Sequence, residues 1–212
     1  MASPRRALVL VDIQQQYFDG PLEIHYPSIT DSLAKTTAAI AAATEAGMPV
    51  VVVQHDGGEG APVFSPGSAS FALHPEIERL RTDDWKHVVK QYSSVYPGTG
   101  LAEWLRERDI DTVTLAGYMT NNCILASAAE AEVLGFTTEV LSDATGAIHL
   151  SNAAGSASAT TVHQTLMALL QSNWAAVAST DEWLTATAAG TSVPASNLVE
   201  SAIAGAQHAV QS

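Results

Sequence analysis

Alternation of short apolar runs with segments of helical periodicity is the feature that most constrains this fold. The run ALVLV at residues 7–11 is continuous and apolar, which is typical of a strand buried on both faces. Strands that alternate with helices pair in parallel through right-handed crossovers. The pattern therefore predicts an α/β fold, a three-layer α/β/α sandwich around a six-stranded, mainly parallel, Rossmann-like sheet. The other strands are expected at 49–54, 87–90, 112–117, 137–142 and 174–179, and helices at 29–46 and 100–109, from about 120 onwards, and at 151–171.

The composition divides the chain into a domain at residues 1–184 and an extension at 185–212. From about residue 185 the sequence shifts to Ala, Ser, Thr and Gly. Past Pro194, a thin apolar stripe indicates either a flexible tail or a short helix docked on this or another subunit. We expect the docked helix, and with it a homo-oligomer, a dimer or higher. The stripe consists of Val199, Ile203, Ala206 and Val210, with Asn197 and Glu200 spaced like a capping box.

Charge and cysteine content exclude several classes of protein. The chain is 47% hydrophobic and carries a formal net charge of −13, which favours a soluble globular protein. The same charge argues against nucleic acid or an anionic membrane as a partner. A single cysteine cannot form an internal disulfide, and the segment MASPRRALVLVD is too short in apolar residues for a signal sequence. We expect a reducing, cytoplasmic setting.

Three reactive side chains stand at the carboxyl ends of predicted strands. Asp12 follows the strand at 7–11, Lys90 closes the strand at 87–90, and Cys123 lies just past the strand at 112–117. Ligands of open α/β sheets gather at this edge, where strand order reverses. Taken singly, Asp12 could be a cap, Lys90 an ion-pair partner and Cys123 a small buried hydrophobe. Their common placement favours a site.

Cys123 suits a nucleophile because TNNC should begin a helix. In the first helical turn, free N–H groups and the positive end of the dipole stabilise a thiolate, and a nearby lysine would lower the thiol pKa further. Aromatic residues near the same strand ends could wall a substrate pocket or be ordinary core and rim residues. Gln14 could bind substrate or cap a turn. The aromatic candidates are Tyr17, Phe18, Tyr92 and Tyr118.

The segments ALVLVDIQQQYF (7–18), FSPGSASFALHPEI (64–77) and the stretch from VVKQYSS to SDATGA (88–147) resemble the isochorismatase-like cysteine hydrolases. That superfamily includes nicotinamidases and N-carbamoylsarcosine amidohydrolases. The resemblance runs from about residue 5 to 184. It implies a catalytic triad of Asp12, Lys90 and Cys123. It also implies a cis peptide between Tyr118 and Met119, which lets the Met119 and Cys123 N–H groups share an oxyanion hole.

The histidines depart from the pattern of the metal-dependent relatives. Nicotinamidases of this family bind a metal through an Asp-x-His pair and a further His, near the loop after the second strand. Here that loop reads VQHDGGEGAPVF, with His55 and Asp56 adjacent and in the opposite order, and the other nearby histidines lack metal-ligand spacing. We therefore expect no metal and no cofactor. The nearby histidines in question are His25, His74 and His87.

Together these features predict a metal-independent cysteine amidohydrolase. It would cleave an amide-type C–N bond of a small molecule through a thioester on Cys123. Two alternatives remain open at this point. One is a vinyl-ether hydrolase of the isochorismatase type that uses Asp12 alone, and the other is a non-catalytic α/β binding protein.

Overall fold

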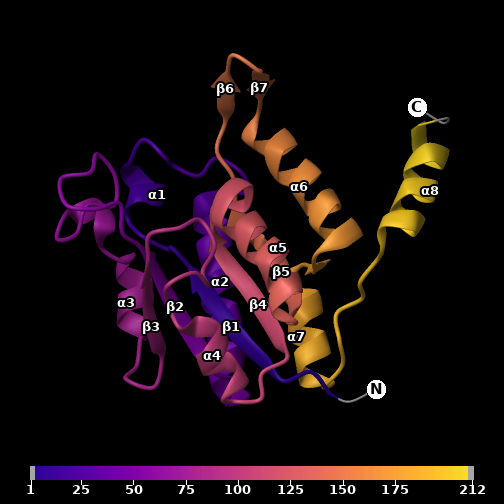
Figure 1. Cartoon of the computed structure of the whole chain (residues 1–212), viewed down its shortest axis with the longest axis horizontal. Coiled ribbons are helices and arrows are strands. Elements are labelled where there is room, and N and C mark those ends of the chain that lie inside the picture. Colours follow the sequence, from indigo (N-terminus) through magenta and orange to yellow (C-terminus); the bar gives the residue numbers. More distant parts are fainter. Residues whose placement is uncertain (1–2, 210–212) are drawn as a thin grey trace.

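The computed structural model describes residues 3–209 and contains one six-stranded sheet (Figure 1). The strand order is β3-β2-β1-β4-β5-β8, and every neighbouring pair is parallel. This confirms the predicted α/β fold. The strands are β1 (Arg6–Val11), β2 (Val50–His55), β3 (Lys86–Lys90), β4 (Thr112–Tyr118), β5 (Thr137–Gly146) and β8 (Ala176–Ala178).

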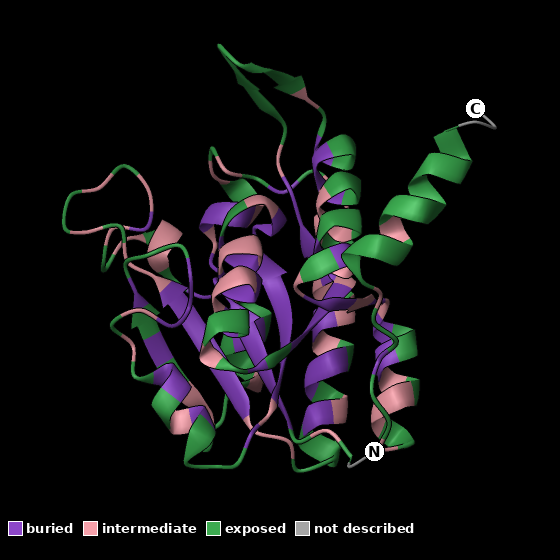
Figure 2. Ribbon diagram, turned by 45° about the vertical axis from the view of Figure 1, so that its right-hand side comes forward, coloured by how far each residue is buried: buried purple, intermediate pink, exposed green. Residues whose placement is uncertain are grey.

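Helices cover both faces of the sheet, so each central strand is buried on two sides (Figure 2). In β1, Ala7, Val9 and Val11 belong to the apolar core on one face, whereas Leu8 and Leu10 belong to the core on the other. This explains why the strand reads as a continuous apolar run rather than an alternating one. The first face is covered by α4 (Leu101–Arg106), α5 (Leu125–Leu134) and α6 (Ala159–Asn173), and the second by α2 (Ile29–Glu45), α3 (Pro75–Leu80) and α7 (Thr180–Ala188).

The helix expected at 151–171 begins later, because a hairpin takes its first residues. Strands β6 (Leu150–Asn152) and β7 (Gly155–Ala157) pair antiparallel and project above the sheet (Figure 1). The Asn152 side chain accepts a hydrogen bond from the Ala154 N–H at 2.8 Å, which closes the turn. Ser158 then caps α6 by accepting from the Thr161 N–H. The Asn152 turn and the Ser158 cap therefore place the start of α6 at Ala159.

A buried polar network ties the amino-terminal half of the sheet together. The Arg6 guanidinium donates two hydrogen bonds to the Glu139 carboxylate, at 2.9 and 2.8 Å. Thr114 and the Trp183 indole donate to the same carboxylate at 2.8 and 3.0 Å. The paired side chains are 3% exposed, and both carboxylate oxygens accept hydrogen bonds. The network therefore joins β1, β4, β5 and α7.

The carboxyl-terminal extension forms a helix, α8 (Leu198–Ala209), that stands away from the domain (Figures 1 and 2). Asn197 caps it by accepting from the Glu200 N–H at 2.9 Å. None of the residues of α8 is buried. Docking on the same subunit is therefore not seen, and Val210 of the predicted stripe lies outside the described residues. Within residues 3–209, no helix has the length and apolar character needed to cross a bilayer.

Candidate active site

The strand order reverses between β1 and β4, and two of the three reactive side chains follow these strands. Strands β2 and β3 lie on one side of β1, and β5 and β8 lie beyond β4. Val11 and Gly117 pair across β1 and β4, one residue before Asp12 and six before Cys123. Such a reversal leaves a crevice at the carboxyl edge of a parallel sheet. The topology places Asp12 and Cys123 at this edge.

Asp12 occupies a left-handed turn at the end of β1. Its φ is 50°, a conformation that Asp tolerates better than most residues, and its N–H donates to the Val53 carbonyl at 3.0 Å. The carboxylate is fully buried, and one oxygen lies 2.7 Å from the Lys90 ammonium. Neither oxygen accepts a hydrogen bond of ordinary geometry among the described residues. The carboxylate is thus held by charge, with acceptor capacity to spare.

Lys90 reaches Asp12 from β3, past the end of the intervening strand β2. The Cα atoms of His55 and Lys90 are paired in register at the ends of β2 and β3. The Lys90 side chain is 0% exposed, and Nζ lies 3.3 Å from Cys123 Sγ. Nζ also lies 3.1 Å from the Tyr92 carbonyl oxygen and 3.2 Å from His55 Nδ1. The ammonium therefore bridges the carboxylate and the thiol.

Cys123 lies in a π-helical turn, Thr120–Ile124, that precedes α5. The peptide bond between Tyr118 and Met119 is cis. Ser127 anchors the turn by donating to the Cys123 carbonyl at 2.6 Å, and the Val95 N–H donates to Ser127. These bonds fix the turn that carries Cys123 against the segment that follows Lys90.

A second anchor holds the start of the same turn. The Thr120 hydroxyl lies 2.9 Å from His163 Nδ1, and His163 Nε2 lies 2.9 Å from the Ser142 carbonyl oxygen. Because a carbonyl can only accept, Nε2 carries the proton and Nδ1 accepts from Thr120. This buried chain connects the turn to α6 and β5.

The expected lowering of the Cys123 pKa is wrong for the resting chain. Burial raises the pKa of the thiol, and the negative charge of Asp12 raises it further, while the Lys90 ammonium opposes both effects. The thiol is 2% exposed, so loss of hydration outweighs the helical turn and the single cation. Burial likewise raises the pKa of Asp12. The arrangement favours a neutral thiol beside a carboxylate that can accept its proton.

Among the aromatic candidates, Tyr17 lies close to the reactive groups, Tyr118 packs on Tyr17, and Phe18 packs on Tyr118. The Tyr17 ring is 2% exposed and contacts the rings of Phe64 and Tyr118 at centroid distances of 5.3 and 5.6 Å. Burial raises the Tyr17 pKa, and the charges of Cys123 and Asp12 add to the effect. Phe18 contacts Tyr118 at 5.9 Å. Among the aromatic candidates, Tyr17 is therefore the one whose pKa is affected by Asp12 and Cys123.

The remaining pocket candidates are either hydrogen-bonded to other residues or exposed. The Tyr118 hydroxyl pairs with the Ser32 hydroxyl at 2.7 Å, so it is turned towards α2. The Tyr92 side chain is 64% exposed. The Gln14 amide donates to the carbonyls of His55 and Phe71 at 3.0 and 2.9 Å and accepts from the His55 N–H at 2.7 Å. Gln14 fastens the ends of β1 and β2, and its amide is already engaged.

His55 also contacts the reactive groups, and the sequence around it, which indicates only failed metal-ligand spacing, does not predict this contact. Its Nδ1 accepts from the Lys90 ammonium, and its ring lies 5.3 Å from that of Phe64. Burial lowers the His55 pKa, and the Lys90 charge lowers it further. A neutral ring with Nδ1 accepting carries its proton on Nε2. Parallel register was the available signal, because it places the last residues of β2 and β3 side by side.

The histidines do not assemble a metal site among residues 3–209. In this part of the chain, no group of three or more His, Cys, Asp or Glu side chains could hold a metal ion. His25 instead stacks on His149, His74 packs on Phe18, and His87 contacts the Gln54 amide. Each has a local partner that accounts for its position.

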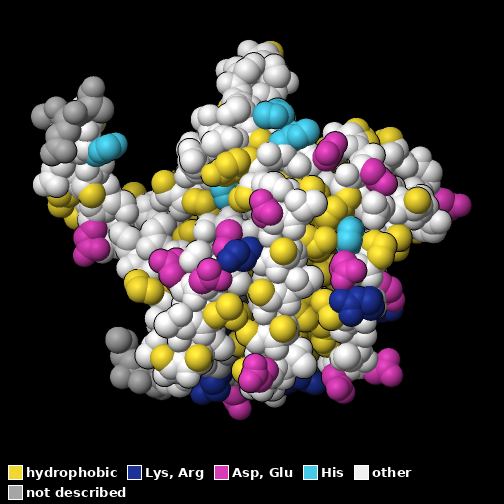
Figure 3. Space-filling model, turned by 180° about the vertical axis from the view of Figure 1, so that it is seen from behind, with side chains coloured by type: hydrophobic (Ala, Val, Ile, Leu, Met, Phe, Trp, Pro, Cys, Tyr) yellow, Lys and Arg dark blue, Asp and Glu magenta, His cyan; other side chains and the backbone are white. Residues whose placement is uncertain are grey.

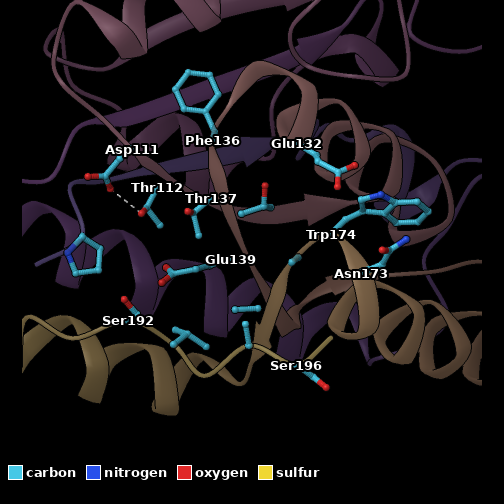
Figure 4. A pocket seen from close by; sticks show the side chains of 16 residues that line it. Asp111, Thr112, Glu132, Phe136, Thr137, Glu139, Asn173, Trp174, Ser192 and Ser196 are labelled. Atoms are coloured by element: carbon cyan, nitrogen blue, oxygen red, sulfur yellow. Dashed lines mark hydrogen bonds between the residues drawn. The ribbon is translucent and has the colours of Figure 1, made fainter. Parts of the chain in front are cut away.

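A sizeable cavity lies at the opposite end of the sheet and is distinct from the reactive groups (Figure 4). Its volume is about 540 Å³, and it opens between the amino ends of β4 and β5 and the segment before α8. Thr112, Thr137, Trp174, Ser192 and Ser196 are among the residues that line it (Figure 4). Substrates of parallel sheets bind at the carboxyl edge, so volume alone is a poor guide here.

Comparisons with known proteins agree with this architecture. Residues 6–182 match the model of the isochorismatase domain. A crystal structure of an isochorismatase-type protein from Burkholderia xenovorans LB400 is 43% identical, with a TM-score of 0.94, and the match covers 98% of this chain and 100% of that one. The chain belongs to the isochorismatase family, which confirms the resemblance noted in the sequence.

Two curated relatives illustrate the range of the family. An uncharacterised isochorismatase family protein of Bacillus subtilis strain 168 is 27% identical over 84% of this chain and 94% of its own length. The maleamate amidohydrolase of Pseudomonas putida KT2440 is 30% identical over 68% of this chain and 73% of its own. Relatives of this chain thus include a hydrolase of an amide.

Proposed function

We propose that this protein is a metal-independent amidohydrolase that cleaves a small carboxamide or related C–N bond through a thioester on Cys123. The observation that carries the proposal is that the buried Lys90 ammonium contacts both the Asp12 carboxylate and the Cys123 thiol. Lys90 Nζ lies 2.7 Å from Asp12 and 3.3 Å from Cys123 Sγ. The named activity of the maleamate amidohydrolase relative supports the same reaction class.

In the proposed mechanism, Asp12 serves first as a base and then as an acid. It takes the proton of Cys123, and the sulfur attacks the substrate carbonyl carbon. Asp12 then protonates the leaving amine as the C–N bond breaks. Water next attacks the thioester, giving the carboxylic acid and restoring the thiol. Burial raises the Asp12 pKa, which makes this carboxyl a stronger base than an exposed one.

Lys90 balances the charge throughout this cycle. The negative charge moves from Asp12 to sulfur and then to the carbonyl oxygen, and the ammonium stays in contact with the first two groups. The N–H groups of Met119 and Cys123 are the proposed donors to the carbonyl oxygen when it becomes negatively charged. Tyr17 and Phe18 are the proposed aromatic walls of the substrate pocket.

The test is detection of a covalent acyl adduct by intact mass across a panel of small primary amides. We expect the parent chain to gain the acyl mass with a matching amide, and Cys123→Ala to gain none and to lose turnover. Turnover that survives in Cys123→Ala would refute the thioester route and favour vinyl-ether chemistry through Asp12. A parent chain with neither adduct nor turnover on any amide or vinyl ether would favour a binding protein.

A further inference from the structure

The extension carries an apolar helix face that the domain does not cover. Leu198, Val199 and Ile203 of α8 are 62%, 68% and 57% exposed. At 100° per residue, Val199, Ile203 and Ala206 lie within about 60° of one another on the helix. Figure 3 shows this part of the chain standing apart from the body of the molecule. An apolar helix face that is exposed to water is typical of an interaction surface.

The segment that precedes α8 is fixed to its own domain. Val193 is 5% exposed, and Arg6 donates to the Thr191 carbonyl at 2.6 Å. Gln171 of α6 donates to the Pro194 carbonyl at 3.3 Å. These contacts tie the segment before the helix to its own domain as far as Pro194. The helix begins a few residues later, at Leu198, and runs at an angle to α6 (Figure 1).

A complementary apolar groove runs along the outer surface of α5 and α6. Its volume is about 380 Å³, and its lining is uncharged. Leu125, Ala126 and Ala129 come from α5, Leu169 comes from α6, and Trp174, the residue after α6, also lines the groove. Leu169 is 39% exposed. The groove has the apolar lining that an apolar helix face would bury.

We propose that α8 of one chain packs into the groove between α5 and α6 of a second copy, and that the exchange is reciprocal in a two-fold dimer. One chain carries both the helix and the groove, so a two-fold pairing covers all four surfaces at once. A foreign helix in the groove would leave α8 exposed. Each copy carries a net charge of −13, yet the groove is uncharged and the exposed face of α8 is apolar. The two copies therefore meet where repulsion between them is weakest.

The interface would adjoin the candidate active site. Ser93, Asn121 and Asn122 border the groove. Asn122 directly precedes Cys123, and Ser93 directly follows Tyr92, whose carbonyl contacts Lys90. The partner's helix would thus lie against both segments that position the reactive groups. This assembly is independent of the reaction catalysed.

Light scattering on the full chain tests the proposal, with Ile203→Asp as the main variant and Ala204→Asp as its matched control. Both changes place a charge on the exposed helix α8, but Ala204 points about 100° away from Ile203. We expect the mass of two chains for the parent and for Ala204→Asp, and of one chain for Ile203→Asp. Leu169→Asp in the groove should also give one chain. Unchanged circular dichroism would show that the variants are folded.

A crosslink between two single variants identifies the contact itself. Ile203→Cys and Ala129→Cys are mixed and oxidised, and we expect a disulfide-linked dimer only in the mixture. The parent chain, whose sole cysteine is buried, serves as the blank. A monomeric parent, an Ile203→Asp variant that stays dimeric, or a mixture without the crosslinked band would each overturn the proposal.

Discussion

Replacing Gly117 by alanine should damage both the sheet and the candidate site. Gly117 lies in β4 opposite Val11, with φ of +110°, a region that residues with a side chain rarely adopt. A Cβ added there overlaps the Val11 carbonyl oxygen and comes within 2.9 Å of the Val11 nitrogen. These are backbone atoms of a central strand, so the overlap cannot be relieved by rotating a side chain.

The cost follows from two separable contributions. A backbone held in a sparsely populated region costs about 1–3 kcal/mol, and overpacking in a tight core costs about 1–3 kcal/mol more. We therefore expect Gly117→Ala to lose roughly 2–6 kcal/mol of unfolding free energy. Relief of the overlap must push Val11 away, and Asp12 follows it directly. A misplacement of about 1 Å can cost about 100-fold in rate.

Gly135→Ala is the matched control for the backbone contribution. Gly135 also has a positive φ, +81°, but a Cβ there meets no atom within 4 Å. Gly135→Ala should lose only the unfolding free energy that a left-handed backbone conformation costs, about 1–2 kcal/mol. Urea unfolding followed by circular dichroism gives both free energies, and turnover on the amide found in the mass assay gives the rates. If Gly117→Ala loses no more stability than Gly135→Ala, the close approach of β1 and β4 is not what requires glycine.

Three further perturbations test the chemistry and the core. Asp12→Asn should lower turnover by about 10²–10⁴-fold, since the base and acid are lost. The same variant should move the pH midpoint of Cys123 alkylation by iodoacetamide downwards, because the Asp12 charge raises the thiol pKa. A midpoint that stays or rises contradicts that reading. Glu139→Gln should cost about 3–5 kcal/mol in urea unfolding, since it leaves the Arg6 charge buried and unpaired. The exposed-pair control Glu103→Gln should stay within about 0.5 kcal/mol, and equal losses would count against the network. Turnover should survive dialysis against a chelator, and one zinc or iron per chain by elemental analysis, together with inactivation, would overturn the metal-free mechanism.

The sequence by itself determined the layered fold and the edge of the sheet where reactive groups stand. Both follow from local patterns, since continuous apolar runs predict doubly buried strands and an Asp or Lys at a strand end is read directly. The prediction missed the hairpin at 150–157, where an asparagine turn and a serine cap outweigh helical spacing.

Only the tertiary structure decided what surrounds each reactive group. The direction of the Cys123 pKa shift depends on burial by several elements, which no short segment reveals. The place of His55 beside Lys90 depends on strand register, and the Gln14 amide is taken up by backbone far along the chain. The free face of α8 likewise depends on where the preceding segment is tied. These properties arise from contacts between distant residues, and local sequence pattern carries little information about them.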